Sequence, residues 1–177
     1  HSLFLKTDGS VWASGRNNYY GALGDGTLVN RPTPVLVMNG VRAIAAGAFH
    51  SLFLKTDGTV WASGFNSDGQ LGDGTTTHRS SPVLVASGIR AVSGAYYHSL
   101  FLKTDGTVLA TGRNNHGQLG DGTTTNRLVP SAVPGLASVR AIAAGSASYV
   151  NNTGYSLFLL NDDSAWACGN TEDGSLG

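Results

Sequence analysis

The nine-residue segment His50-Ser-Leu-Phe-Leu-Lys-Thr-Asp-Gly58 decides the architecture of this chain. The same nine residues stand at His1–Gly9 and at His98–Gly106, and a divergent fourth copy spans Tyr155–Asp163. Successive copies begin 49, 48 and 57 residues apart. A period of this size indicates one structural unit copied along the chain, in which each copy covers the apolar face of its neighbour.

One complete unit, residues 41–88, is predicted to hold about four short strands and no helix. In the repeated segment the leucines alternate with Ser, Phe and Lys, which is the period of a strand with two different faces. Asp57-Gly58 then separates two strand-like runs and predicts a tight hairpin. Repeats of about 40–50 residues with four antiparallel strands are typical of a β-propeller blade, and they favour it over a straight β-solenoid, whose repeats are usually shorter.

The predicted fold is therefore all-β, a β-propeller of four-stranded antiparallel blades with about three and a half blades present. We divide the chain into a partial first repeat that lacks its first strand, two complete repeats, and a partial fourth repeat with an insert at 146–154. The boundaries are 1–40, 41–88, 89–138 and 139–177.

The composition restricts the classes of partner. Lys and Arg together number 11, as do Asp and Glu, so we expect neither nucleic acid nor an anionic membrane as a partner. The sequence has no apolar run near the ~20 residues of a membrane span. Cys168 is the single cysteine, which excludes an internal disulfide and leaves both a reducing cytosol and a disulfide-free secreted protein open.

The stretch Gly47–Gly74 resembles the repeat of the regulator of chromosome condensation family, and the copy at His98–Gly122 matches it with Leu109 in place of Trp61. The Lys-Thr-Asp-Gly-Thr-Val-Trp and Gly-Asp-Gly-Thr-Thr-Thr runs are similar to those of bacterial members. The resemblance implies a ring of seven blades. The chain is then an incomplete propeller, and we expect the ring to be completed by the rest of a longer chain or by another copy.

Residues that recur in each copy are expected to build the fold. We expect the recurring histidines to form structural hydrogen bonds rather than bind metal, and the recurring aspartates to form turns rather than bind calcium. The recurring arginines are expected to bond carbonyls or carboxylates between blades, and the tryptophans to fill the core or the space between blades. These residues are His1, His50, His98; Asp8, Asp57, Asp105, Asp25, Asp73, Asp121; Arg31, Arg79, Arg127, Arg42, Arg90, Arg140; and Trp12, Trp61, Trp166.

No catalytic motif or metal-ligand cluster is recognisable in the sequence, and Cys168 occupies the position of Ser14 and Ser63 in earlier copies. The sequence therefore predicts a protein that is not an enzyme and has no cofactor, no catalytic residue and no metal site.

Positions that differ between copies are the candidates for binding a partner. Aromatic and Arg side chains on loops are frequent hot spots of protein interfaces. The predicted partner-binding residues are Arg16, Tyr19, Tyr20, Phe65, Tyr97, Arg113, His116 and Tyr149.

These observations predict a non-enzymatic scaffold that binds a protein or a glycan through variable loops on one face of the ring. We expect it outside the cell or at the cell surface, with a cytoplasmic location not excluded. One alternative is a guanine-nucleotide exchange factor for a small GTPase, the activity of the family's founding member, with the insert 146–154 as its wedge. Others are an enzyme inhibitor and a structural segment of a large adhesin or fibre.

Overall fold

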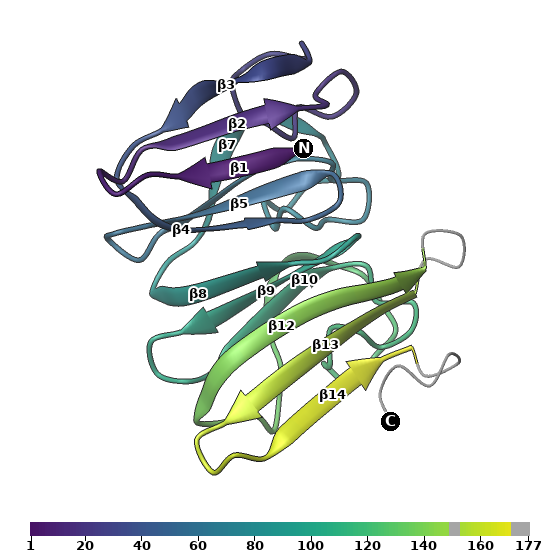
Figure 1. The fold of residues 1–177 in the computed structure, drawn as a ribbon. Coiled ribbons are helices and arrows are strands. Elements are labelled where there is room, and N and C mark those ends of the chain that lie inside the picture. Colours follow the sequence, from purple (N-terminus) through teal and green to yellow (C-terminus); the bar gives the residue numbers. More distant parts are fainter. Residues whose placement is uncertain (149–152, 171–177) are drawn as a thin grey trace.

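The structure, a computed structural model, describes residues 1–148 and 153–170. These residues form four antiparallel sheets that follow one another along the chain (Figure 1). No part of the described chain is helical, and so it contains no helix long and apolar enough to cross a membrane. The all-β prediction is confirmed, as is the prediction of antiparallel blades.

Each sheet is a meander of consecutive strands, with three strands in sheets 1 and 4 and four strands in sheets 2 and 3. Sheet 1 holds β1 (Ser2–Leu5), β2 (Val11–Gly15) and β3 (Arg31–Met38); sheet 2 holds β4 (Val41–Ala46), β5 (His50–Lys55), β6 (Val60–Gly64) and β7 (Arg79–Ala86); sheet 3 holds β8 (Ile89–Gly94), β9 (His98–Lys103), β10 (Val108–Gly112) and β11 (Arg127–Ala132); sheet 4 holds β12 (Val139–Ser148), β13 (Thr153–Leu160) and β14 (Ala165–Gly169).

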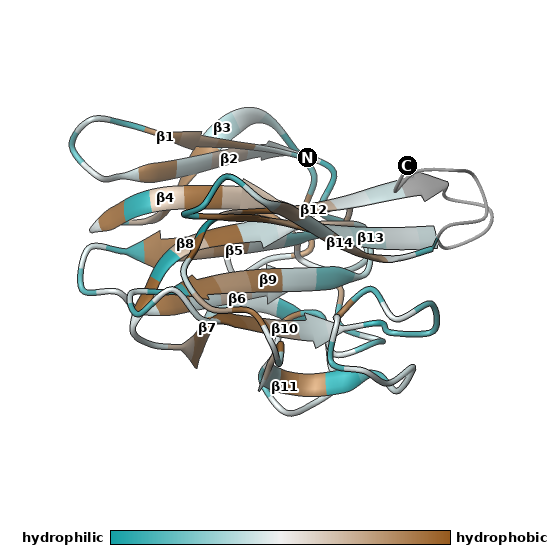
Figure 2. Ribbon diagram, turned by 90° about the horizontal axis from the view of Figure 1, so that it is seen from below, coloured by the Kyte–Doolittle hydropathy of each residue, from teal (hydrophilic) through white to brown (hydrophobic). Residues whose placement is uncertain are grey.

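The two faces of the repeated strand pack against two different sheets. Leu52 and Leu54 of β5 lie in a buried cluster with Phe101 of sheet 3, whereas Phe53 lies in a cluster with Val11 of sheet 1. Figure 2 shows these hydrophobic segments in the central parts of the inner strands, with hydrophilic residues at the turns. The alternation in the repeated segment therefore places one apolar face on each neighbouring sheet, as the sequence predicts.

Histidines that are fully buried (His50, His98) or half-buried (His1) join neighbouring sheets. The Nε2 atom of each recurring histidine lies 2.8–3.0 Å from the hydroxyl oxygen of a serine in the next sheet. That serine donates its own hydrogen to a backbone carbonyl, so it accepts from the imidazole, which must carry its proton on Nε2. The three sets are His1–Ser51–Ala22, His50–Ser99–Gln70 and His98–Ser156–Gln118, and we call them histidine rungs. The prediction of structural histidines is confirmed.

Burial keeps the imidazoles of His50 and His98 neutral. It lowers the pKa of His50 to about 3, with repulsion from His98 as a second cause. It lowers the pKa of His98 to about 4, although a backbone hydrogen bond with Tyr155 acts in the opposite direction. A side chain at Gly47 would overlap the His50 ring, so the rung requires glycine at this position.

The arginine prediction is correct for one series and wrong for the other. Arg42 and Arg90 donate from Nη2 to backbone carbonyls in the next sheet, those of Ile89 and Val139, at 2.9 and 2.5 Å. Arg31, Arg79 and Arg127 instead bind the aspartates of their own loops, because these arginines begin the strand to which the loop returns. Arg140 also pairs within its own sheet, with Asp163.

The tryptophan prediction fails in sheet 4. Trp61 packs partly buried between sheets 1 and 2, but Trp166 on β14 is 56% exposed. Phe4 on sheet 1 is 46% exposed, whereas its counterpart Phe53 is fully buried. The physical reason is that sheets 1 and 4 each have a face on which the described chain packs no further sheet.

Candidate partner-binding site

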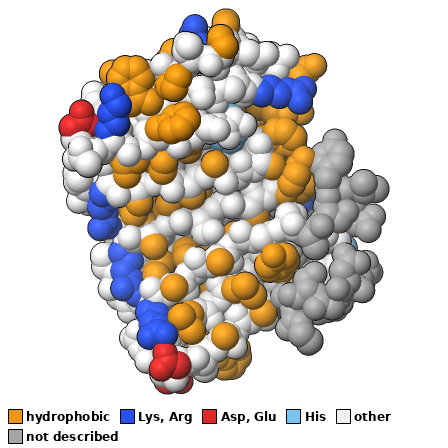
Figure 3. All heavy atoms as spheres, in the orientation of Figure 1, with side chains coloured by type: hydrophobic (Ala, Val, Ile, Leu, Met, Phe, Trp, Pro, Cys, Tyr) orange, Lys and Arg blue, Asp and Glu red, His pale blue; other side chains and the backbone are white. Residues whose placement is uncertain are grey.

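The meander brings one class of loops to one end of all the sheets. Since successive strands are antiparallel, every loop that follows an even-numbered strand lies at the same end, which is on the right in Figure 1. In that view Lys and Arg side chains form a row along the left edge, at the opposite end (Figure 3). The variable loops identified in the sequence all follow even-numbered strands, so they all lie at the same end of the sheets.

A buried asparagine builds the base of each long loop. In the loop β6–β7, Asn66 is fully buried, and its Nδ2 donates to Asp73 Oδ1 at 2.9 Å and to two threonine carbonyls. Its Oδ1 accepts from the Leu71 N–H at 3.0 Å. Asn17 and Asn114 make corresponding bonds in the loops β2–β3 and β10–β11. Because one amide satisfies several buried groups, these loop bases are rigid.

The aspartate of each base is held as a carboxylate. Asp121 accepts from Thr123 and pairs with Arg127 Nε at 2.7 Å. Partial burial raises the pKa of Asp121, but the bonds from Thr123 and Arg127 outweigh burial and lower it to about 2. The turn role predicted for these aspartates is confirmed. Among the residues that the structure describes, no group of three or more His, Cys, Asp or Glu side chains is placed to hold a metal.

Seven aromatic rings from four loops meet above these bases. Tyr20 of sheet 1 lies with its ring centroid 4.7 Å from that of Phe65 of sheet 2, and Phe49 lies 5.3 Å from Tyr96 of sheet 3. Most pairs are edge-on or tilted, which is the favourable arrangement for aromatic rings. We call this the aromatic cluster, and its members are Tyr19, Tyr20, Phe49, Phe65, His78, Tyr96 and Tyr97.

Two arginines lie on tyrosines of the cluster. One is paired with a carboxylate and mostly buried, and the other is exposed. The Arg113 guanidinium lies 4.0 Å from the Tyr97 ring centroid and forms two hydrogen bonds with the Asp68 carboxylate, at 3.1 and 3.0 Å. The Arg16 guanidinium lies 4.8 Å from the Tyr19 ring, and its Nε donates to the side chain of Asn18 at 3.3 Å. Arg16 is exposed, while the Arg113 side chain is only 16% exposed.

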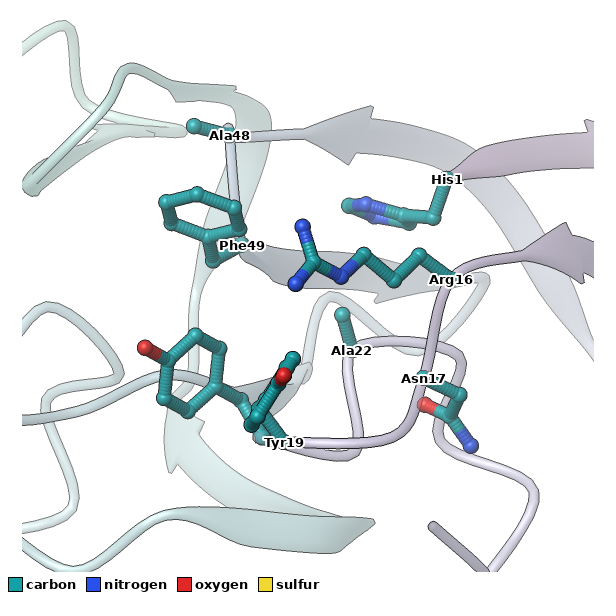
Figure 4. Close-up of a pocket in the computed structure, with 8 residues that line it drawn as sticks. His1, Arg16, Asn17, Tyr19, Ala22, Ala48 and Phe49 are labelled. Atoms are coloured by element: carbon teal, nitrogen blue, oxygen red, sulfur yellow. The ribbon is translucent and has the colours of Figure 1, made fainter. Parts of the chain in front are cut away.

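Two adjoining hollows open between Arg16 and the cluster. The smaller has a volume of about 50 Å³ and lies between Arg16, Tyr19 and Phe49 (Figure 4). The larger, about 240 Å³, extends over Phe65 to Tyr97. The surface is therefore a shallow aromatic basin with a cation at its rim.

Comparison with known proteins identifies the repeat. A family model described as the regulator of chromosome condensation (RCC1) repeat matches residues 8–54, 57–102 and 105–149, and a second model of the same repeat matches 41–70 and 89–118. The chain belongs to the RCC1 repeat family. No curated protein sequence matches the chain.

Solved structures show the same fold. Yeast RCC1 (Prp20), in a structure described as Kap60 bound to it, has a TM-score of 0.80 and 24% identity over 96% of this chain and 42% of that one. Human WBSCR16 has a TM-score of 0.80 and 26% identity over 94% of this chain and 44% of that one. A second Prp20p structure, from Saccharomyces cerevisiae, has a TM-score of 0.78 at 24% identity, over 94% of this chain and 42% of that one.

The chain thus spans less than half the length of each of these three proteins, which agrees with the prediction of about three and a half blades.

The structure brings together most of the residues predicted to bind a partner. Five of them, Arg16, Tyr19, Tyr20, Phe65 and Tyr97, line the larger hollow, and Arg113 lies against Tyr97. His116 is exposed on the loop β10–β11 but makes no ring contact with the cluster within the described chain. Tyr149 lies outside the described residues.

The sequence reasoning left three members out of the predicted site. Phe49 and Tyr96 precede the repeated histidine strand, and His78 ends the following loop. Their signal is that each is aromatic at a position where the other copies vary. What the sequence could not show is that Phe49 and His78 meet Tyr20, and that Tyr96 meets Phe49.

Cys168 fits the role of a small strand residue. It lies on β14, and its side chain packs against the cluster of buried residues between sheets 3 and 4. Burial, with the nearby Asp121 as a second cause, raises the pKa of its thiol to about 11. The thiolate is therefore scarce near neutral pH.

Proposed function

We propose that these RCC1 repeats form part of a protein-binding scaffold, which receives its partner on the aromatic cluster. The observation that carries the proposal is the convergence of loops from three sheets on one basin, in which Tyr19 is 58% exposed and Tyr20, Phe49, Phe65 and Tyr97 are partly exposed. Aromatic and Arg side chains grouped in this way are typical of interface hot spots.

The rigidity of the loop bases supports binding. A side chain that is already ordered loses little conformational entropy when a partner arrives. Asn17 and Asn66 hold the loops that carry Tyr19, Tyr20 and Phe65 by buried hydrogen bonds, so this part of the basin is preformed.

A protein partner is consistent with what is known of similar folds. One structure of yeast Prp20 shows it with Kap60 bound, and the other is reported together with the binding of Prp20p to Gsp1p and histones. At 24% identity this likeness shows the fold alone, so the partner of the present chain is argued from its own surface.

The other functions inferred from the sequence remain predictions. The exchange-factor alternative depends on the insert 146–154, of which residues 149–152 lie outside the described part of the chain. The glycan-binding, inhibitor and fibre alternatives, and a location at the cell surface, likewise remain predictions.

The test is selection of a phage-displayed random-peptide library on the purified chain, followed by titration of the enriched peptides. We expect the substitution Tyr19→Ser to weaken peptide binding about tenfold, because it removes an exposed hot-spot ring. Leu84→Ala is the matched control, since Leu84 is 54% exposed on β7 away from the cluster. Equal affinities of the wild type and Tyr19→Ser for every enriched peptide would exclude the cluster as the binding surface.

A further inference from the structure

One of the three described loop bases has a hydrogen-bond acceptor that titrates near neutral pH. In the loop β6–β7 the backbone N–H of Asn66 donates to the Nδ1 atom of His78, and the two nitrogens lie 3.0 Å apart. An imidazole nitrogen takes up a proton in the physiological range, whereas an amide oxygen does not. In the other two bases the acceptor is an amide oxygen, that of Asn30 for Asn17 at 2.7 Å and that of Asn126 for Asn114 at 2.9 Å.

The bond from Asn66 fixes the protonation state of His78. An N–H group donates to an unprotonated ring nitrogen, so the imidazole is neutral and carries its proton on Nε2. A proton added at Nδ1 would turn this acceptor into a donor and set two N–H groups against each other. Turning the ring over would not replace the acceptor, because it brings a ring carbon to the same place. Protonation therefore breaks the bond to Asn66.

The same imidazole is a member of the aromatic cluster. It stacks on Phe65, with centroids 5.0 Å apart and ring planes at 27°, and Tyr20 meets it edge-on at 4.9 Å. Phe65 directly precedes Asn66, so the hydrogen bond and the stacking hold the same piece of backbone. Phe65 also contacts Tyr97 of sheet 3, at 6.0 Å. Loss of the bond to Asn66 would thus loosen a ring to which loops of three sheets contribute contacts.

The surroundings of His78 do not depend on where the chain begins or ends, because sheet 2 has a described sheet packed on each face. His78 is exposed, so water can deliver a proton to it. Burial of part of the ring lowers its pKa, and no neighbouring charge contributes to that shift. The charged and titratable groups around it are Asp73 and Arg79 of its own loop, which pair with each other; Asp68 of that loop and Arg113 of sheet 3, which also pair; and Tyr20 and Arg16 of sheet 1.

We infer that His78 is a positioning residue that makes the aromatic cluster depend on pH. The neutral imidazole accepts the Asn66 N–H and holds Phe65 in place. The protonated imidazole releases that N–H, so the loop becomes less ordered and a partner that binds it must restrict more conformational freedom. The inference rests on the proposed protein-binding function and adds its regulation: the surface binds best near neutral pH and more weakly in mild acid.

The pH range of the effect follows from the direction of the pKa shift. Because the pKa of His78 in the folded chain lies below the 6.5 of an unperturbed histidine, the change falls on the acid side of pH 6.5. The histidine rungs respond at lower pH, since the pKa values of His50 and His98 are about 3 and about 4. Measurements between pH 7.5 and pH 5.0 therefore address His78 while both buried imidazoles stay largely neutral.

Nuclear magnetic resonance tests the inference without a partner. At pH 7.5 the ¹⁵N shifts of His78 should show an unprotonated Nδ1 and a protonated Nε2. As the pH falls to 5.0, the Asn66 amide signal should titrate together with this imidazole. Its hydrogen exchange, corrected for the intrinsic effect of pH, should rise at least about threefold relative to that of Asn114. An Asn66 amide that keeps its shift and its protection while His78 takes up a proton overturns the inference.

Peptide binding measures the consequence at the cluster. A peptide from the phage selection that contains no Asp, Glu or His is titrated at pH 7.5 and pH 5.0, so that only the protein changes its charge. The wild type should bind about fivefold more weakly at pH 5.0. His78→Asn supplies the acceptor that the other two loops use, and its affinities at the two pH values should be equal.

The quantity compared is the ratio of the two affinities, because the loss of the His78 ring changes the affinity at both pH values alike. His116→Asn is the matched control. It makes the same substitution at an exposed histidine of the loop β10–β11, which has no ring contact with the cluster in the described chain, and it should keep the wild-type ratio.

The outcomes separate the inference from the proposed function. Equal ratios for the wild type and His78→Asn overturn the inference, as they would if the protonated ring stayed on Phe65 as a cation–π pair. The proposed function still stands in that case, provided that the peptide depends on Tyr19. If no enriched peptide depends on Tyr19, the proposed function fails, and the behaviour of the Asn66 amide alone decides whether His78 controls the order of the cluster.

Discussion

The loops β2–β3 and β10–β11 begin with the same three residues, Arg-Asn-Asn, and are held by the same kind of buried asparagine. Their arginines nevertheless differ in partner and in exposure. In both loops the second residue is the buried asparagine that holds the base. Arg113 is clamped by Asp68 of the neighbouring loop, whereas Arg16 lies exposed beside Tyr19. The role of a residue in these repeats is thus decided by what the adjacent repeat supplies.

The electrostatic cost of leaving the arginine without a carboxylate also differs between Arg113 and Arg16. The Arg113 and Asp68 side chains are 16% and 13% exposed, so each would be a poorly solvated charge without the other. An exposed guanidinium such as that of Arg16 keeps most of its hydration and carries no such requirement. Arg113 is therefore predicted to stabilise the fold of the described residues, whereas Arg16 is predicted to contribute little to it.

The largest expected effect concerns the histidine rungs beneath the long loops. The Ser51, Ser99 and Ser156 hydroxyls of the rungs donate to carbonyls in the loops β2–β3, β6–β7 and β10–β11, respectively. The folded-state pKa values of His50 and His98, about 3 and about 4, lie below the value of 6.5 of an unperturbed histidine. Between the folded-state and the unperturbed pKa values, the unfolded chain binds more protons than the folded chain. The free energy of unfolding therefore falls as the pH falls below 6.5.

By pH 4 each of these two histidines should lower the free energy of unfolding by on the order of 3 kcal/mol. Urea unfolding from pH 7 to pH 4 measures this, and His98→Gln should flatten the curve, while His116→Gln on the exposed tip should not. Parallel curves for the wild type and His98→Gln would show that the rung does not govern acid unfolding.

The next effect tests whether the two loop bases are equivalent. We expect Asn114→Ala to lower the free energy of unfolding by about 3 kcal/mol, because the buried Leu119 N–H loses its acceptor and several oxygens lose their donor. Asn17→Ala should cost a similar amount. Thermal unfolding with Asn115→Ala, an exposed neighbour, as the control measures both, and a large difference between the two variants would refute the shared base.

A smaller effect is expected from breaking the clamp itself. Asp68→Asn should lower the free energy of unfolding by about 1–2 kcal/mol, since it leaves the Arg113 charge without its carboxylate in a mostly buried position. The variant should also make Arg113 resemble Arg16. Urea unfolding measures the change, with Ser67→Ala on the same loop as the control. Unchanged stability would mean that water solvates Arg113 adequately.

The smallest effect is expected at Arg16. Arg16→Gln should change the free energy of unfolding by less than about 0.5 kcal/mol, because the side chain is exposed and has no carboxylate partner in the described chain. Arg113→Gln, measured beside it, should cost more. A loss of stability at Arg16 equal to that at Arg113 would remove the distinction on which the comparison depends.

The sequence anticipated the recurring structure well because that structure is encoded locally. The alternation of Leu52, Phe53 and Leu54 defined the two faces of a blade before any neighbour was known. The sequence did not show that Arg31 would bind an aspartate of its own loop, whereas Arg42 would bind a backbone carbonyl of the next sheet. That choice depends on where the two side chains end in space, since both recur at the same period.

The candidate site was only partly predictable for the same reason. Variation between copies pointed to Tyr20, Phe65 and Tyr97, but nothing in the pattern brought Phe49 or His78 beside them. Likewise, Arg16 and Arg113 look alike in the sequence, and only the position of Asp68 tells them apart.

The sequence by itself determined the strands, the hairpins, the repeat and the residues that vary within it, because each follows from the order of side chains over a few neighbouring positions. The tertiary structure alone decided which of these residues meet. Rings and charges from loops 30–50 residues apart converge only once the sheets of the propeller pack side by side. Contact with a carboxylate from the neighbouring loop is then what makes Arg113 part of the fold.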